Sequence, residues 1–302
     1  MPKLIIQLQG GLGNQMFQYA TARSISLKNN LDLVIDDWSG FFRDVHHQRK
    51  YELNNFQIEG RIAKFYEKLP FIYINTCTKL KKKFNLINKL SFGNYLQEQL
   101  NSNNHGMKFQ QEIQKANLNK NTWMKGYWQS HLYFEKYKSL ILHELTPPQP
   151  KQNNFRFIGK EISRTNSIAL GLRIYEESND PTSHAFNKKI KSIFEINKVI
   201  SKLKKNDPNC RFFVFCTRRF NFFKELNLPE NTIFLTHDDG YKGTIERMWL
   251  LSQCKHHVFN NSSFYWWGAW LSSKNHESIK QTIYASDNFV NQDGFLKEWK
   301  KF

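Results

Sequence analysis

The stretch from His256 to Trp270, HHVFNNSSFYWWGAW, decides the fold of this chain. It begins with a short apolar run, which is typical of a buried β-strand. Residue types that favour the N-cap of a helix come next: Asn261, Ser262 and Ser263. Apolar residues and a glycine then recur at helical spacing: Phe264, Trp267, Gly268 and Leu271. The stretch therefore predicts a strand, a turn and a helix.

A turn of this kind directs backbone N–H groups and the positive end of the helix dipole to one point, where phosphate binds readily. An ordinary strand-to-helix turn with an aromatic core face gives the same local pattern. The pattern alone therefore leaves a phosphate site and a purely structural turn both open.

The chain of 302 residues is strongly basic: 44 lysines and arginines stand against 26 aspartates and glutamates, a net charge of +18. Such a surplus favours a polyanionic partner, which can be nucleic acid, an anionic membrane surface or a phosphorylated small molecule. Hydrophobic residues make up 40% of the chain and aromatic residues 15%, which excludes an intrinsically disordered protein.

The four cysteines form no C-x-x-C pair, so we expect free thiols in a reducing compartment. No apolar run reaches about 18 residues, and the chain opens with a strand rather than a signal peptide. We therefore expect a cytoplasmic protein without a membrane-spanning helix.

A strand at Leu4–Leu8, a glycine-rich loop at Gln9–Gln15 and a helix follow one another at the N-terminus. This order indicates an α/β domain, and Gly11 and Gly13 allow a ligand to approach the backbone closely. The loop is not the full dinucleotide-binding fingerprint, because its last glycine is missing.

The next predicted strand, Leu31–Ile35, ends at Asp36 and Asp37. Carboxylates at the carboxyl end of such a strand lie where ligands bind, although turn chemistry gives them an equally ordinary role. Residues 60–100 then alternate lysines with apolar residues. That pattern fits a helix on an anionic membrane surface, and it equally fits a solvated helix face.

The proline-containing segment Thr146–Asn154 predicts a linker, so we expect domains at 1–150 and 151–302. Strands are predicted in the second domain at 168–172, 211–216, 232–235, 257–259 and 281–284. Helices are predicted at 187–205, 220–226, 244–255, 263–272 and near the C-terminus. This alternation indicates a parallel sheet covered on both faces.

Three segments resemble the bacterial α-1,2-fucosyltransferases of glycosyltransferase family 11. They are Gly10–Ala20 (GGLGNQMFQYA), Gly126–Ser130 (GYWQS) and Asn261–Leu271 (NSSFYWWGAWL). The resemblance runs in register over nearly the whole chain, and its matches are far more specific than a pair of glycines.

The resemblance implies a GT-B-type α/β architecture, with two Rossmann-like domains that face each other across a cleft. The N-terminal domain is then the acceptor side, and the C-terminal domain binds GDP-fucose. It implies inverting transfer of L-fucose from GDP-β-L-fucose to the 2-hydroxyl of a terminal β-galactoside, without a required metal or cofactor. The absence of an Asp-x-Asp motif agrees with the last point.

One motif departs from the family. Where the family usually carries His-x-Arg-Arg-x-Asp, this chain has Gly171-Leu172-Arg173-Ile174-Tyr175-Glu176. Arg173 keeps the place of the first arginine and Glu176 that of the aspartate. The histidine and the second arginine are lost, which suggests a subgroup with an altered donor site.

We expect Arg173 to hold the pyrophosphate, because a guanidinium binds phosphate oxygens bidentately; a structural ion pair at a strand end is the alternative. We also expect donor contacts from residues of both matching loops, with turn stabilisation or helix capping as their alternative role: Gly11, Gly13, Asn14, Gln15, Asn261, Ser262, Ser263 and Phe264. By resemblance, Glu246 reads the nucleotide ribose; otherwise it is an exposed helix acid.

The general base must reach the acceptor hydroxyl. Asp36, Asp37 and Glu176 are candidates and His131 a poorer one; with Arg173, Asp37 and Glu176 form the catalytic set that we expect. The histidines show no metal-ligand spacing, so we expect no metal site.

The leading interpretation is thus a fucosyltransferase of O-antigen or lipopolysaccharide synthesis, in peripheral contact with the cytoplasmic face of an anionic inner membrane that carries a lipid-linked acceptor. A GT-B enzyme with another nucleotide-sugar donor is the main alternative. A basic nucleic-acid-binding protein is a third, although the tryptophans in apolar runs favour core positions over exposed stacking platforms. The acceptor sugar and its linkage stay open.

Overall fold

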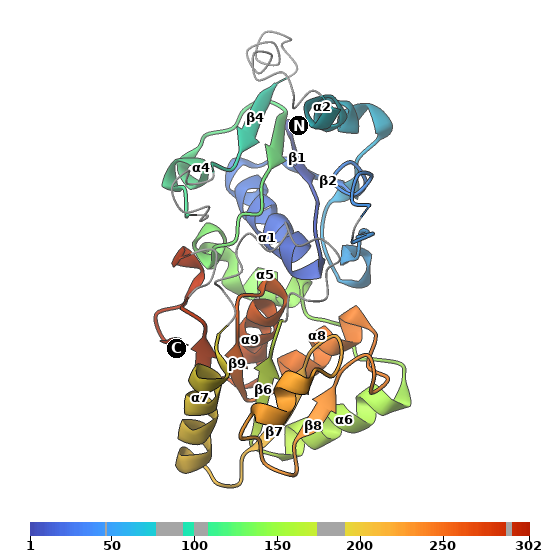
Figure 1. Cartoon of the computed structure of the whole chain (residues 1–302). Coiled ribbons are helices and arrows are strands. Elements are labelled where there is room, and N and C mark those ends of the chain that lie inside the picture. The colour runs from blue at the N-terminus through green and yellow to red at the C-terminus, as the bar shows by residue number, and fades with distance from the viewer. Residues whose placement is uncertain (46, 77–92, 100–107, 174–190, 288–291) are drawn as a thin grey trace. The chain divides into compact units, whose positions relative to one another are not determined.

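The computed structural model describes residues 1–45, 47–76, 93–99, 108–173, 191–287 and 292–302. The chain forms two compact units (Figure 1). Unit 1 consists of Met1–Leu145 and Asn291–Gly294, and unit 2 of Thr146–Val290 and Phe295–Phe302. The division thus falls after Leu145 instead of after residue 150, and a short segment near the C-terminus returns to unit 1.

Unit 1 contains a five-stranded parallel sheet with the order β3-β2-β1-β5-β4. Its strands are β1 (Lys3–Gln7), β2 (Asp32–Asp36), β3 (Arg61–Ile62), β4 (Asn94–Gln97) and β5 (Thr122–Lys125). Its α-helices are α1 (Leu12–Asn29), α2 (Phe65–Thr76), α4 (Gln111–Lys115) and α5 (Lys138–Glu144). Its 3₁₀ helices are η1 (Leu53–Asn55), η3 (His131–Tyr133), η4 (Glu135–Tyr137) and η9 (Gln292–Gly294).

The strand order of unit 1 reverses beside β1. β1, β2 and β3 follow one another in one direction, and the chain then crosses back to β4 and β5. Since crossover connections are right-handed, this reversal places α1 and α2 on opposite faces of the sheet. Phe71 of α2 accordingly packs with Ile5 and Val34 of the sheet. The reversal makes the carboxyl ends of β1 and β5 the ligand-binding edge of this unit.

Unit 2 contains a six-stranded parallel sheet with the order β11-β10-β9-β6-β7-β8. Its strands are β6 (Ser167–Gly171), β7 (Arg211–Phe215), β8 (Ile233–Leu235), β9 (His256–Phe259), β10 (Ile283–Ala285) and β11 (Lys300–Lys301). Its helices are α6 (Asn153–Arg164), α7 (Ile193–Asn206), η8 (Asn221–Glu225), α8 (Thr244–Gln253) and α9 (Ser263–Asn275). The strand order reverses between β6 and β9.

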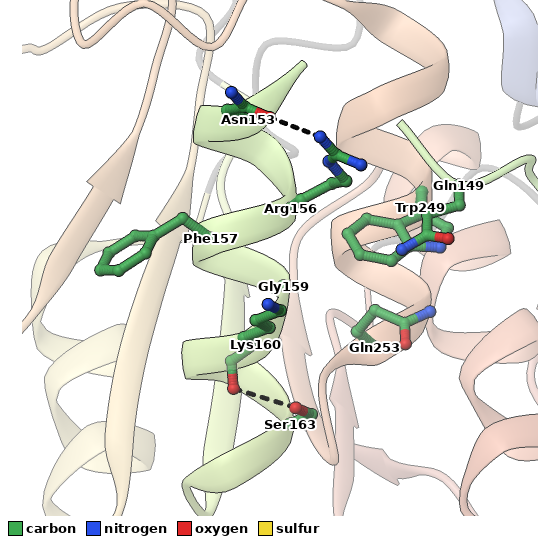
Figure 2. A pocket seen from close by; sticks show the side chains of 9 residues that line it. All are labelled: Gln149, Asn153, Arg156, Phe157, Gly159, Lys160, Ser163, Trp249 and Gln253. Atoms are coloured by element: carbon green, nitrogen blue, oxygen red, sulfur yellow. Dashed lines mark hydrogen bonds between the residues drawn. The ribbon is translucent and has the colours of Figure 1, made fainter. Parts of the chain in front are cut away.

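Two helices of unit 2, α6 and α8, pack closely because Gly159 carries no side chain. A Cβ atom at Gly159 would lie only 2.3 Å from the ring of Trp249. Trp249 and Gly159 both line a pocket, which has a volume of about 670 Å³. Figure 2 shows Trp249 beside α6. The remaining lining residues are mostly polar or basic: Gln149, Asn153, Arg156, Phe157, Lys160, Ser163 and Gln253.

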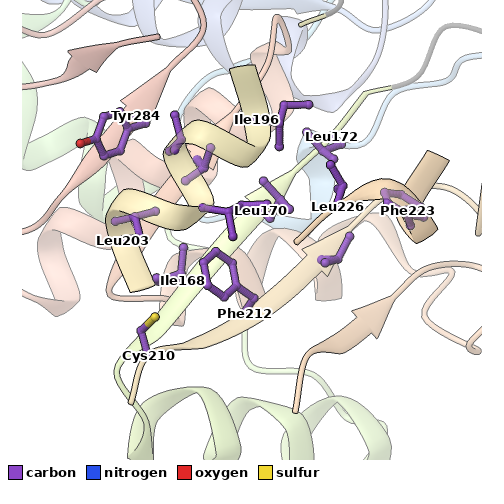
Figure 3. Close-up of a cluster of buried hydrophobic side chains, with 14 of the residues drawn as sticks. Ile168, Leu170, Leu172, Ile196, Leu203, Cys210, Phe212, Phe223, Leu226 and Tyr284 are labelled. Atoms are coloured by element: carbon purple, nitrogen blue, oxygen red, sulfur yellow. The ribbon is translucent and has the colours of Figure 1, made fainter. Parts of the chain in front are cut away.

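The opposite face of this sheet is covered by α7. Ile168, Leu170 and Phe212 of the strands pack there against Ile196 and Leu203 of the helix (Figure 3). Side chains of a strand alternate between faces, so Ala169 and Gly171 point to the other side. These small residues leave room for α9.

The α/β class with parallel sheets is therefore confirmed, and so are the strand and helix of the opening stretch. Other expectations were wrong. The described C-terminal residues form the 3₁₀ helix η9 and the strand β11 instead of an α-helix, and residues 221–225 form a 3₁₀ helix. α6 begins at Asn153, inside the segment that we interpreted as a linker. We included Asn153 and Asn154 in that linker because asparagine is common in turns.

No helix among the described residues is long and apolar enough to cross a membrane. Three of the cysteines, Cys210, Cys216 and Cys254, are buried free thiols, as expected. Cys77 lies outside the described residues, and so do the lysines at 79–83 on which the membrane-contact expectation partly rested.

The carboxylate of Glu67 is a main electrostatic anchor of unit 1. It is 4% exposed and accepts hydrogen bonds from Arg61, from the backbone N–H of Lys64 and from Lys3. These bonds, foremost the one from Arg61, lower the pKa of Glu67 from 4.5 to about 2. The carboxylate thus joins β1, β3 and the start of α2.

We predict that Glu67→Gln lowers the free energy of unfolding by roughly 2 to 3 kcal/mol at pH 7. The folded-state pKa is depressed, so this stabilisation is complete above the unfolded pKa of about 4.5 and is lost as the pH falls toward 2. Urea unfolding of both proteins between pH 7 and pH 3 should show the difference shrinking by more than half. Glu277→Gln, at an exposed position, is the control. A pH-independent difference would contradict the electrostatic role.

Candidate active site

The turn between β9 and α9 lies at the strand-order reversal of unit 2. Ser262 is the N-cap residue of α9, and its carbonyl accepts the first helical bond from Trp266 at 3.0 Å. Its hydroxyl makes no capping hydrogen bond. The first turn of α9 contains no acidic residue, so the helix dipole there is not offset by a carboxylate. Ser262 is buried and Ser263 and Phe264 are partly exposed.

Asn260 fixes the backbone of Arg173 at this edge. Its Oδ1 accepts from the Arg173 N–H at 2.8 Å, and its Nδ2 donates to the Arg173 carbonyl at 2.7 Å. Its own N–H donates to the Gly171 carbonyl at 3.3 Å. Asn260 is 2% exposed. These bonds extend the pairing of β6 with β9 past the ends of both strands and bring Arg173 beside the start of α9.

The ring of Tyr265 lies where a side chain at position 171 would project. A Cβ atom at Gly171 would be 2.5 Å from this ring, and the Tyr265 hydroxyl donates to the Phe215 carbonyl at 2.8 Å. The residue that replaces the family's usual histidine is therefore a glycine for a packing reason. Position 171 has no room for a side chain while Tyr265 occupies this place.

Glu246 lies in the first turn of α8. Its carboxylate accepts from the Gln152 amide at 3.2 Å, at the start of α6. The expected ribose contact stays a prediction, and this geometry is equally that of an ordinary surface acid. Glu176, the other predicted acid of this unit, lies outside the described residues.

The neighbour of Glu246, Arg247, is buried at the carboxyl edge of β7. It donates to the Cys216 carbonyl at 2.9 Å and contacts the His237 ring at the same distance. Burial and the charge of Arg247 lower the pKa of His237. The sequence does not indicate this buried position, because an arginine on a helix is usually exposed.

In unit 1, the glycine loop leads into α1 at the reversal of that sheet. Gly10 has φ +76°, which favours glycine, and Gly11 is the N-cap residue. The first turn of α1 includes Gly13 and Asn14, has no acidic residue, and receives no side-chain cap. The Arg49 guanidinium lies beside Gly11, about 3.5 Å from where a Cβ would stand. This cation was also not foreseen.

Gln15 is fully buried and bonded to the chain itself. Its Nε2 donates to the Gly10 carbonyl at 3.0 Å and to the Lys50 carbonyl at 2.9 Å, and its Oε1 accepts from the Glu52 N–H at 3.0 Å. Asn14 Oδ1 accepts from Gln129 at 2.8 Å. For Gln15 the geometry favours the turn-stabilising alternative, and a donor contact stays only a prediction.

The two aspartates after β2 differ in environment. Asp36 is fully buried, accepts the N–H groups of Trp38 and Ser39, and bonds the Ser39 hydroxyl. Burial raises its pKa. Asp37 is partly exposed and pairs with Lys68 at 2.6 Å. Asp36 therefore serves the turn, and Asp37 is the more accessible carboxylate.

Within the described residues, no three His, Cys, Asp or Glu side chains gather as metal ligands would. The pocket between α6 and α8 includes none of the predicted site residues. The hydrogen-bonded polar residues described above lie at the carboxyl edges of the two sheets: Asn260 and Arg173 in unit 2, and Gln15 and Asp36 in unit 1.

Comparison with known proteins identifies the family. The family described as Glycosyl transferase family 11 matches residues 3–302. The chain belongs to this family. The predicted family membership is thus confirmed, and the protein is a glycosyltransferase.

Two relatives come from Escherichia coli. The chain is 29% identical over 284 residues to an alpha-1,2-colitosyltransferase, covering 90% of this chain and 89% of the relative. It is 26% identical over 288 residues to the O-antigen biosynthesis glycosyltransferase WbnK, covering 88% and 89%. The crystal structure of fucosyltransferase NodZ from Bradyrhizobium shares the fold, with a TM-score of 0.51, 14% identity and coverage of 89% of this chain and 92% of that chain.

We predict that Gly171→Ala destabilises the protein by about 1 to 3 kcal/mol, because the added methyl group overlaps the Tyr265 ring. The measurement is the urea midpoint, in the wild-type background and in a Tyr265→Leu background. The cost should be much smaller in the second background, since the ring is gone. An equal cost in both would show that Tyr265 does not fill this space.

Proposed function

We propose that this glycosyltransferase transfers L-fucose from GDP-β-L-fucose to the 2-hydroxyl of a terminal β-galactoside, with inversion, in O-antigen or related surface-polysaccharide synthesis. The observation that carries the proposal is the fixed position of Arg173. Asn260 holds its backbone at the strand-order reversal of unit 2, beside the N-terminus of α9. Open α/β sheets bind nucleotides at such a point.

The proposed reaction breaks the bond from the anomeric carbon to the pyrophosphate oxygen while the galactoside oxygen attacks from the opposite face. Negative charge grows on the departing pyrophosphate. We propose that Arg173 and the backbone N–H groups at the start of α9 bind that charge. In our proposal these groups do so without a metal.

The attacking hydroxyl must lose its proton to a base within hydrogen-bond reach. Asp37 is our first candidate, because it is partly exposed whereas Asp36 is buried and bonded to its own turn. The carboxylate is held on one side by Lys68, whose Nζ lies 2.6 Å from its Oδ1. Glu176 is the second candidate.

Colitose is the second candidate for the transferred sugar. The relative with 29% identity is a colitosyltransferase, and colitose is L-fucose without its 3-hydroxyl. A site that does not hydrogen-bond this hydroxyl admits both sugars, whereas a site built around it rejects the deoxy sugar strongly. Because the motif around Gly171 and Arg173 departs from the family's usual one, GDP-fucose and GDP-colitose must both be tested as donors.

The charge of +18 supports a second part of the proposal, which is peripheral contact with an anionic membrane that carries a lipid-linked acceptor. The nucleic-acid alternative loses support, because Trp123, Trp128, Trp266 and Trp267 are all buried. Stacking on bases requires exposed rings.

The first test is GDP release from GDP-fucose and from GDP-colitose, in EDTA, with and without lactose or Gal-β1,3-GalNAc. We expect release that depends on both a donor and a galactoside and that survives EDTA. Methyl β-glucoside is the control acceptor. If folded enzyme that binds GDP releases none with any galactoside, the proposed acceptor is wrong. If EDTA abolishes release, the metal-free mechanism is wrong.

A second test addresses Arg173. We expect Arg173→Ala to lower kcat about 100-fold, corresponding to about 3 kcal/mol, as when an oxyanion donor is lost. Asn260→Ala keeps the guanidinium but removes its positioning bonds, so we expect an intermediate loss of about 10-fold. The double variant should lose no more than Arg173→Ala alone.

The control for these variants is Arg156→Ala, at an exposed arginine of α6 in the same unit. It should leave kcat unchanged. Thermal melting separates lost positioning from lost folding. An Asn260→Ala enzyme with wild-type kcat, or additive losses in the double variant, would show that Asn260 does not act through Arg173.

A further inference from the structure

Two exposed aromatic rings stand together just after β2. Trp38 is 45% exposed and Phe42 is 37% exposed. The rings are stacked, with centroids 5.1 Å apart and an interplanar angle of 17°. Exposed aromatic surface that the core does not use is a common sign of a binding site.

The turn that carries these rings is held rigidly. Asp36 accepts the N–H groups of Trp38 and Ser39 at 3.1 and 2.9 Å, and Gln7 of β1 donates to the Ser39 hydroxyl at 2.6 Å. A Cβ at Gly40 would lie 2.0 Å from the carbonyl oxygen of Leu8. The turn is therefore pressed against the end of β1, where the glycine loop begins.

The backbone bonds and the buried Phe41 account for the shape of the turn, but they do not require exposed aromatic rings at Trp38 and Phe42. The Phe41 and Phe42 N–H groups donate to the Trp38 carbonyl at 2.9 and 3.3 Å, and Phe41 points into the core. Trp38 and Phe42 are thereby placed one helical turn apart on the outside. The Arg43 guanidinium also lies over the Phe42 ring, 5.2 Å from its centroid. Phe42 thus contacts both the Trp38 ring and the Arg43 guanidinium, and Trp38 offers the larger exposed ring surface.

A terminal β-galactose has a chemistry that suits such a surface. Its C3, C4 and C5 hydrogens form an apolar patch on one face of the ring, and this patch stacks well on an indole. The 2-hydroxyl lies at the edge of the sugar ring, so stacking leaves it accessible to a base. Asp37, the partly exposed carboxylate, directly precedes Trp38 in the same turn.

We infer that the Trp38–Phe42 stack is the acceptor subsite, where Trp38 contacts the apolar face of the terminal galactose and Phe42 supports the indole. This inference rests on the proposed function for the identity of the sugar. It assigns acceptor recognition to a turn that the family motifs in this chain do not include.

The test uses Trp38→Ala, Trp38→Phe and Phe42→Ala in the full-length protein. We expect Trp38→Ala to raise the KM for lactose at least about 10-fold, while the KM for the donor and kcat change less than about threefold. Trp38→Phe should retain most of the affinity, and Phe42→Ala should give a smaller rise than Trp38→Ala. Melting curves check that each variant is folded.

Phe157→Ala and Phe194→Ala are matched controls, because these rings are 63% and 77% exposed on α6 and α7 of unit 2. They should leave both KM values unchanged. A Trp38→Ala variant that behaves like the controls would overturn the inference. So would an equal rise in donor and acceptor KM, which would indicate a structural role.

Saturation-transfer NMR with methyl β-galactoside separates this inference from the proposed function, since it needs no donor. Binding to the wild type that is lost in Trp38→Ala supports the subsite even if no transfer occurs. Transfer by the wild type together with unchanged galactoside binding in Trp38→Ala supports the proposed function and rejects the subsite. If Trp38→Ala loses contact with a second copy of the chain in sedimentation but keeps the lactose KM, the rings serve a protein interface and the inference is wrong.

Discussion

The close approach of α9 to the carboxyl end of β6 is the constraint on which the candidate donor site depends. Two glycines make it possible. Gly171 leaves room for the Tyr265 ring, and Gly268 lets α9 pack on α8, since a Cβ there would lie 2.7 Å from the Cβ of Leu251. With the helix so placed, Asn260 reaches both backbone groups of Arg173. A side chain at either glycine would push α9 outward and weaken that connection.

Both units place a helix N-terminus at the reversal of a parallel sheet, and both leave it electrostatically open. α1 and α9 lack an acidic residue in the first turn. Neither receives a side-chain cap, because Gly11 has no side chain and the Ser262 hydroxyl makes no capping bond. A surface helix gains about 1 kcal/mol from such a cap. The absence of a cap is not special to these helices, since α6 also lacks a side-chain cap and a first-turn acid. What sets α1 and α9 apart is their place at the strand-order reversals, which is where an anion site is proposed. The arginines nearby, Arg49 in unit 1 and Arg173 in unit 2, have the sign that such a site requires.

The sequence predicted those parts that local pattern determines. The strand and helix around Asn261, the glycine loop and the parallel class follow from apolar spacing and N-cap residue types. What it missed depends on tertiary contacts. Nothing in the sequence shows that the Gln15 side chain bonds the backbone of Lys50 and Glu52, or that Asp36 bonds its own turn. Nor does it show that Asn260 bonds a residue 87 positions away in sequence.

The same limit applies to larger features. α6 was missed because its first residues, Asn153 and Asn154, resemble a turn. The return of residues 291–294 to unit 1 is stabilised by Asp293, whose carboxylate accepts from the Phe109 N–H at 2.8 Å and whose carbonyl accepts from the Ser130 hydroxyl at 3.1 Å. Such a pairing of distant segments leaves no local signature in the chain.

The glycine of the altered motif, Gly171, is tied to Tyr265 by a steric constraint. A histidine at position 171 and the present ring of Tyr265 exclude each other by sterics, since even a Cβ would lie 2.5 Å from that ring. The tyrosine also bonds the Phe215 carbonyl, so it ties α9 to β7 as well as filling the space beside β6. Position 171 thus carries no polar side chain, and the packing of Tyr265 in its place fixes α9 against the sheet. In the proposed function, donor recognition then rests on Arg173 and the backbone of α9, and the choice between similar deoxy sugars rests on contacts outside this motif.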